Sequence, residues 1–153
     1  MSFDDVGFGT GERGAWENDP AWQGFRKLVE KGLVAYDWAE AFVAMNLVAR
    51  PAAEEATLRG LGASARHNGD TLLGLLTDAQ LVDADRHRRW TGALVKLALG
   101  HEGNKAALDG WIAKWAPLGD AAIDAYCADL PDAPGAAEKA KEAVAAFRKG
   151  VGL

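Results

Sequence analysis

Three residues on two predicted helices could bind a metal ion or form a buried ion pair. Glu40, Asp83 and His87 each fall among apolar residues that recur every three or four positions, the spacing of a helix face that is buried. A lone charge in such a face is costly, so it must be paired, neutral or bound to a metal. In helical bundles with a carboxylate-bridged di-iron site, each half-site takes a Glu from one helix and a Glu-x-x-His from the next. In this chain Glu40 comes first, followed by Asp83 and His87 on a later helix, which is the order of ligands in one half-site.

The spacing departs from the di-iron pattern. Ala84 stands three positions before His87, where the second glutamate would be, and the nearest acids are Asp83 and Asp85. Asp83 lies on the right side of the helix but is one carbon shorter and one position displaced, whereas Asp85 points to another face. The alternative to a degenerate metal half-site is a buried polar network without metal. Its members would be Glu40, Asp83, Arg86 and His87. The planar guanidinium of Arg86 could pair with Glu40. An incomplete ligand set favours the network, so we predict no catalytic residue and no metal ligand in this chain.

A long helix from about Asp70 to Leu99 carries most of these groups. Asp70 is a suitable N-cap, and Gly100 to Gly103 forms a turn after the helix. We expect one stripe of this helix to face the core. The stripe is Leu72, Leu76, Ala79, Asp83, His87, Trp90, Leu94 and Leu97.

The other segments also show helical periodicity, and no strand pattern appears. A first helix should begin at Asp19-Pro20, a cap followed by proline at the first helical position, and run to about Ala49. Arg50-Pro51 predicts its end or a kink. The buried face expected for this helix is Trp22, Phe25, Val29, Leu33, Tyr36, Glu40, Val43 and Leu47. Further helices are expected at about 52–66, 104–129 (bent at Pro117) and 136–149.

The predicted class is therefore all-α, with three parts. Residues 1–15 are glycine-rich and aperiodic, which indicates a flexible tail. Residues 16–131 form the helical domain, and the proline-rich break at 131–135 separates a short C-terminal helix within 132–153.

The composition excludes several classes of function. With 153 residues, a net charge of -5 and 49% hydrophobic residues, the chain is typical of a globular domain and has no basic surface for nucleic acid or anionic membranes. Cys127 is the only cysteine, so no internal disulfide or thiolate cluster can form, and a cytoplasmic location is expected. The first residues lack the basic-then-apolar pattern of a signal peptide, and no apolar run approaches the length of about 18 residues that spans a membrane, so we expect a soluble protein. Six tryptophans are many for this length, and we expect some of them at an interface.

Three ordered blocks between Trp16 and Pro131 resemble a known family. The blocks are YDWAEAFVAMNLVARP, ARHNGDTLLGLLTDAQLVDADRHRRW and GNKAALDGWIAKWAPLGDAAIDAYCADLP. They resemble the C-terminal half of the small (β) hydroxylase subunit of bacterial multicomponent di-iron monooxygenases, which oxidise toluene, phenol, alkenes and propane. This resemblance implies a ferritin-like helical bundle that has lost its iron ligands. By position, it makes Glu40 a retained carboxylate, Ala84 the lost glutamate and His87 a retained histidine.

The chain is much shorter than the β subunits of that family, so only half of a bundle would be present. Half a bundle leaves an apolar face uncovered, which a partner chain or a second copy would have to cover. We therefore expect a non-catalytic scaffold subunit of a di-iron hydroxylase acting on small hydrocarbons or aromatics. Its partner would be a hydroxylase α-like subunit that carries the iron.

The alternative is an enzyme in its own right. A homodimer could combine Glu40, Asp83 and His87 from two chains into a di-iron or di-manganese oxidoreductase. Whether the chain is an enzyme stays open at this point, because one chain holds no complete metal site.

Overall fold

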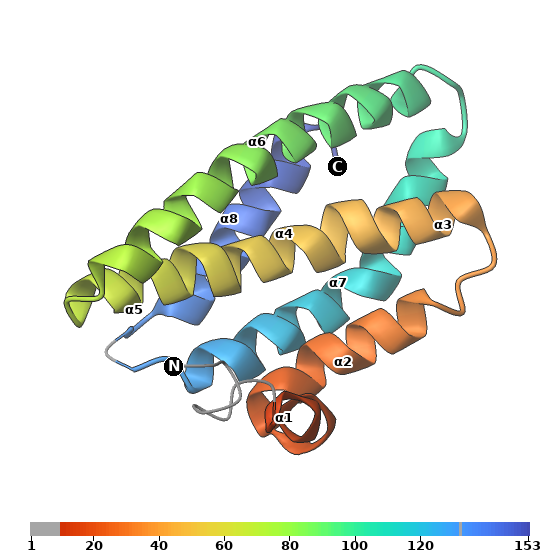
Figure 1. The fold of residues 1–153 in the computed structure, drawn as a ribbon. Helices are drawn as coiled ribbons and strands as arrows, with labels where there is room; N and C mark the ends of the chain where they lie inside the picture. Colours follow the sequence, from red (N-terminus) through yellow and green to blue (C-terminus); the bar gives the residue numbers. More distant parts are fainter. Residues whose placement is uncertain (1–9, 132) are drawn as a thin grey trace.

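The structure, a computed structural model, describes residues 10–131 and 133–153. These residues are almost entirely helical and contain no strand, which confirms the predicted all-α class (Figure 1). The helices, in chain order, are α1 (Glu12–Asn18), α2 (Pro20–Gly32), α3 (Trp38–Val43), η2 (Ala44–Ala49), α4 (Arg50–Ala53), η3 (Glu54–Gly60), α5 (Leu61–His67), α6 (Thr71–Leu99), α7 (Asn104–Ala128) and α8 (Ala136–Gly150). Of the tail expected over 1–15, positions 12–15 belong to α1, and positions 1–9 lie outside the described residues.

The first predicted helix is in fact two helices. Its start is as expected, because the Asp19 carboxylate accepts a hydrogen bond from the amide of Ala21 and Pro20 follows the cap. The helix ends at Gly32, and a new one begins after Asp37, whose carboxylate accepts from the amides of Ala39 and Glu40. The N-cap at Asp37 therefore starts a new helix, even though apolar residues continue at helical spacing through this region. Leu33 and Tyr36 of the predicted face are consequently exposed in the intervening turn.

Pro51 lies inside a continuous helical path from Trp38 to His67, so the predicted end or kink at Arg50-Pro51 does not divide it. A helical proline lacks the amide hydrogen and its ring crowds the preceding turn. Here the preceding turn is the π-helical segment η2, in which the backbone is wider. Pro51 is fully buried there, and a second π-helical segment, η3, follows it.

The later helices follow the sequence closely. The Asp70 carboxylate accepts from the amide of Leu73 and caps α6, and α7 continues through Pro117. Gly103 and Gly135 adopt the left-handed backbone that precedes α7 and α8, with φ of 85° and 72°. Within the described part of the chain, no helix is long and apolar enough to cross a membrane.

The continuous helix from Trp38 to His67, made of α3, η2, α4, η3 and α5, is called the long helix below. The core lies between this long helix and the helices packed on it. α2 runs beside α7, and α7 and α8 pack against η2 and η3, while α6 runs along the other edge of the long helix (Figure 1). Apolar side chains of α2, the long helix, α7 and α8 form the main cluster, so the C-terminal helix shares the core of the preceding segments. A second cluster joins the long helix to α6, α7 and the C-terminal residues.

The face of α6 that is buried differs from the predicted one. Leu72, Leu76, Asp83, Trp90 and Leu97 of the expected stripe are exposed. The buried residues are mostly small: Gly74, Thr77, Ala84, Thr91, Gly92 and Val95. Small side chains let α6 approach its neighbours closely, as a Cβ atom added to Gly62 of α5 would lie 2.4 Å from the Thr77 hydroxyl oxygen. The prediction of the buried face was therefore wrong: the face of α6 that is buried is rotated about the helix axis relative to the predicted stripe.

Gly24 marks the closest approach of α2 to α7 and offers a test of this packing. A Cβ atom at position 24 would lie 2.5 Å from the Cα atom of Ala122, which is backbone and cannot move aside. We expect Gly24→Ala to lower the free energy of unfolding by about 1–3 kcal/mol in urea denaturation. As a control, Gly110→Ala on α7 meets no atom within 4 Å and should stabilise the protein, by about 0.5–1 kcal/mol. Equal effects of the two variants would contradict the α2–α7 packing.

Candidate functional site

Glu40 lies in the first turn of α3, and its partners come from α7. Its carboxylate accepts hydrogen bonds from the ammonium of Lys114 and, at 2.9 Å, from the indole Nε1 of Trp115. The hydrogen bond from Lys114, followed by that from Trp115, lowers the pKa of Glu40 below its usual value. The ammonium of Lys114 also lies 5.4 Å from the Trp115 ring centre. Glu40 therefore ties α3 to α7 instead of pairing with Arg86.

Asp83 and Arg86 are not part of a buried network. Their side chains are 70% and 72% exposed, and Arg86 Nη1 lies 2.9 Å from Asp83 Oδ1. They pair with each other on the outer side of α6. The prediction that these two residues belong to a buried cluster was wrong, because both side chains lie at the surface, Asp83 at the rim of a groove between α6 and the long helix.

His87 is half-buried, and its imidazole lies beside the uncharged side chains of Thr91 and Trp90. Its Nε2 atom lies 3.3 Å from the Thr91 hydroxyl, and its ring centre lies 5.6 Å from that of Trp90. Burial, with the nearby positive charge of Arg50, lowers the pKa of His87. The four predicted residues are thus not brought together: Glu40 binds α7, Asp83 pairs with Arg86, and His87 faces Thr91.

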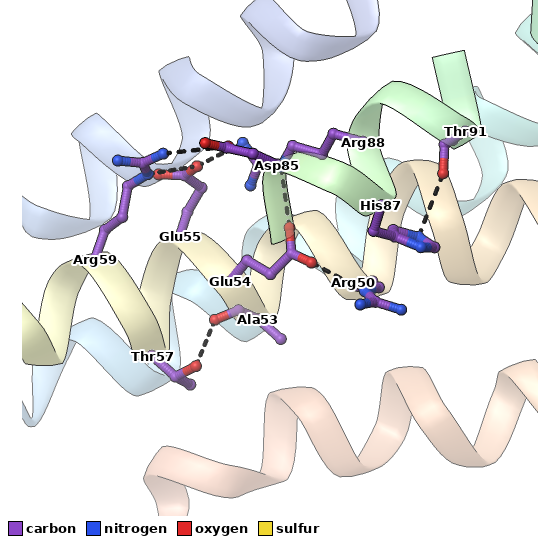
Figure 2. A network of polar contacts seen from close by, with 10 residues as sticks. All are labelled: Arg50, Ala53, Glu54, Glu55, Thr57, Arg59, Asp85, His87, Arg88 and Thr91. Carbon is purple, nitrogen blue, oxygen red and sulfur yellow. Dashed lines mark hydrogen bonds and ion pairs between the residues drawn. The ribbon is translucent and has the colours of Figure 1, made fainter. Parts of the chain in front are cut away.

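A different ionic network joins the long helix to α6 (Figure 2). Glu54 and Glu55 of η3 are only 6% and 4% exposed. Glu54 accepts from Arg50 Nε at 2.9 Å and from Arg88 Nε, on α6, at 3.0 Å. Glu55 accepts from Arg59 Nε at 3.1 Å and from Arg88 Nη1 at 2.8 Å. One guanidinium thus bridges two buried carboxylates that are neighbours in the sequence.

The outer parts of this network reach other elements. Arg59 lies 3.9 Å from Asp85 of α6, and the Arg88 guanidinium lies 5.6 Å from the ring centre of Phe147 on α8. Two of the contacts, Arg50–Glu54 and Glu55–Arg59, have the four-residue spacing of helix-surface pairs and were visible in the sequence. The role of Arg88 was missed, because nothing in the sequence shows which face of α6 meets η3.

The residues of one chain do not fit a di-iron cluster. Ala84, at the position of the second glutamate, is buried and offers no donor atom. The acids nearest to it across the helix interface, Glu54 and Glu55, are already neutralised by guanidinium groups. Among the described residues, no three His, Cys, Asp or Glu side chains are grouped closely enough to hold a metal ion. The arrangement can stabilise a helix pair electrostatically, and we derive no metal chemistry from it.

Arg88 provides a direct test of this network. We expect Arg88→Met to lower the free energy of unfolding by about 3 kcal/mol, because it leaves two buried carboxylates with one cation each. Arg86→Met is the matched control, since its exposed pair with Asp83 should contribute less than about 0.5 kcal/mol. Both values come from urea denaturation at neutral pH. A loss for Arg88→Met as small as that of the control would show that the network does not stabilise the fold.

Glu40 gives a second, pH-dependent test. Because its native pKa is lowered, the carboxylate stabilises the fold above the pKa of the unfolded chain, and this contribution is lost as the pH falls through the native pKa. We expect Glu40→Gln to cost about 1–2 kcal/mol at pH 7, and the difference from the wild type to shrink in acid. Glu102→Gln, in the exposed turn after α6, should have little effect at any pH. A difference that does not change with pH would contradict the assigned role.

The chain as a whole is similar to known hydroxylase subunits. A family described as Methane/Phenol/Alkene Hydroxylase matches residues 1–102. The chain is 51% identical, over 130 residues, to the β subunit of the toluene-4-monooxygenase hydroxylase of Ectopseudomonas mendocina, covering 85% of this chain and 40% of that protein. It is 30% identical to the phenol 2-monooxygenase oxygenase component DmpL of Pseudomonas sp. strain CF600, over 71% of this chain and 35% of that protein.

A solved structure shows the same fold. A chain of toluene 4-monooxygenase (T4moH), with toluene bound in its resting active site, superposes with a TM-score of 0.79 and 52% identity. The match covers 84% of this chain. It covers 42% of the solved chain, toward the C-terminal part of that chain. The chain thus spans less than half the length of these relatives.

Proposed function

This chain belongs to the methane, phenol and alkene hydroxylase family, and we propose that it acts as a structural, non-catalytic subunit of a multicomponent di-iron hydroxylase. The observation that carries the proposal is the 51% identity to a hydroxylase β subunit. The relatives described above belong to toluene and phenol monooxygenases, and the chain is also 28% identical to the hydroxylase small subunit of a propane 2-monooxygenase of Mycolicibacterium smegmatis. The complex would therefore oxidise small hydrocarbons or aromatics.

The polar interior of the chain supports a structural role. Where a metal site would need free carboxylates, Glu54 and Glu55 are held by arginines, and Glu40 is held by Lys114 and Trp115. Charge-assisted contacts of this kind hold the carboxylates against neighbouring helices and rigidify a helix bundle. In this proposal the iron is carried by a hydroxylase α-like partner in the cytoplasm.

The alternative of a homodimeric metal oxidoreductase is not favoured by any observation on the described residues. Glu40 and His87 make their contacts on different elements, and Asp83 is paired with Arg86 on the exposed side of α6. A two-fold axis that joined the three ligands of both chains would first have to break these contacts.

Co-expression with the α subunit of the Ectopseudomonas mendocina toluene-4-monooxygenase tests the proposal. We expect the two chains to co-purify, with iron found by elemental analysis in the complex and not in the chain alone. His87→Ala should leave the iron content of the complex unchanged, because the imidazole lies against Thr91 and Trp90 and belongs to no group of metal-binding side chains among the described residues. Iron bound stoichiometrically by the chain alone, and lost in His87→Ala, would overturn the proposal. Failure of the two chains to co-purify would also contradict it.

A further inference from the structure

The solvent-exposed side of α6 carries a regular stripe of eight residues. The stripe consists of Leu72, Leu76, Ala79, Asp83, Arg86, Trp90, Ala93 and Leu97, and all eight are exposed. The four large apolar members are 53–69% exposed, and α6 lies at the edge of the molecule (Figure 1). From Leu72 to Leu97 the stripe is about 38 Å long at the helical rise per residue. Contiguous apolar surface of this kind indicates an interaction site.

The spacing of this outer stripe is that of a coiled coil. Successive members are four, three, four, three, four, three and four positions apart, which is the a/d repeat of a heptad. Leu75 and Val82, both more than 60% exposed, flank it. The heptad is thus maintained along nearly the whole exposed side of the helix, although Trp90 also contacts the long helix, with its ring centre 6.0 Å from that of Phe42. Packing within this chain does not require such a repeat there, whereas packing against another helix does.

The order of residues along the stripe is self-complementary. When a second α6 lies antiparallel to the first, with the two-fold axis between positions 84 and 85, each residue faces its counterpart in the partner. The facing pairs are Leu72 with Leu97, Leu76 with Ala93, Ala79 with Trp90, and Asp83 with Arg86. Leucines meet at both ends, each large side chain in between faces an alanine, and the central charges are opposite. The two-fold symmetry repeats every pair, so the central layer holds two acids and two arginines.

From this register we propose that the chain forms a two-fold homodimer through an antiparallel α6 pair, with Asp83 of each copy facing Arg86 of the other. The α6 helix of a second copy would cover the whole stripe from Leu72 to Leu97, with apolar residues facing apolar residues and opposite charges facing each other.

Charge reversal tests the register directly. Light scattering over a range of concentrations should show a dimer for the wild type. Asp83→Arg alone and Arg86→Asp alone should each weaken the dimer by about tenfold or more, because like charges then face each other across the axis. An equal mixture of the two variants should restore a dimer that contains one chain of each kind, and so should the double variant within one chain.

The matched control reverses a comparable ion pair away from α6. Lys105 and Asp109 on α7 form an exposed pair at 2.8 Å, and Asp109→Arg should leave the dissociation constant unchanged. Circular dichroism of each variant reports whether the helices are intact, and Leu72→Lys with Leu97→Lys provides a second disruption without a change at the centre.

Three outcomes would overturn the proposal. The first is a wild type that stays monomeric. The second is a dimer that neither Asp83→Arg nor the leucine variants weaken. The third is a one-to-one complex with the segment of the Ectopseudomonas mendocina β subunit that lies outside the matched region, formed in place of the dimer and abolished by the leucine variants. All of these measurements use the chain without a hydroxylase α subunit, so they are independent of the co-purification that tests the proposed function.

Discussion

The bridge made by Arg88 between Glu54 and Glu55 determines how α6 is oriented. Both carboxylates are buried, so they require cations, and Arg50 and Arg59 satisfy only one contact each. The remaining contacts come from α6, and they place the Arg88 side of that helix against η3. Small residues on the same side allow the close approach, and the opposite side is left to solvent or a partner. The exposed stripe is the face of α6 that remains when Arg88 and these small residues are turned inward.

The long helix is also constrained near Pro51, where its backbone departs from regular α-helical geometry. A proline in a regular α-helix would open the backbone toward solvent, but here it is buried between two π-helical segments. Glu54 and Glu55 open the second of these segments, directly after α4. The proline, the two π segments and the ionic bridge therefore lie in one region, where the helix departs from regular geometry and α6, α7 and α8 all pack against it.

These features explain how a family fold associated with iron can act as a scaffold. The residues that the sequence suggested as a half-site are a buried alanine at Ala84, a carboxylate engaged with α7 at Glu40, and a histidine directed at Thr91. Glu40 and His87 each have a partner within the fold, so the interior is stabilised by hydrogen bonds and ion pairs between helices. Such an interior suits a subunit whose surfaces, especially the outer face of α6, mediate assembly.

The sequence by itself determined the helical class, the caps at Asp19 and Asp70, the passage of α7 through Pro117 and the family, because these depend on local residue chemistry and on ordered blocks of sequence. It did not determine the break at 33–37, where a cap at Asp37 competes with a continuing apolar period. Nor did it determine the buried side of α6, since that helix has an apolar heptad on one side and small residues on the other. Only the tertiary structure decided between them, because the small side permits close packing and places Arg88 against two buried acids. Glu40 found its partners on α7 for the same reason: residues 74 and 75 positions apart meet only when the helices pack.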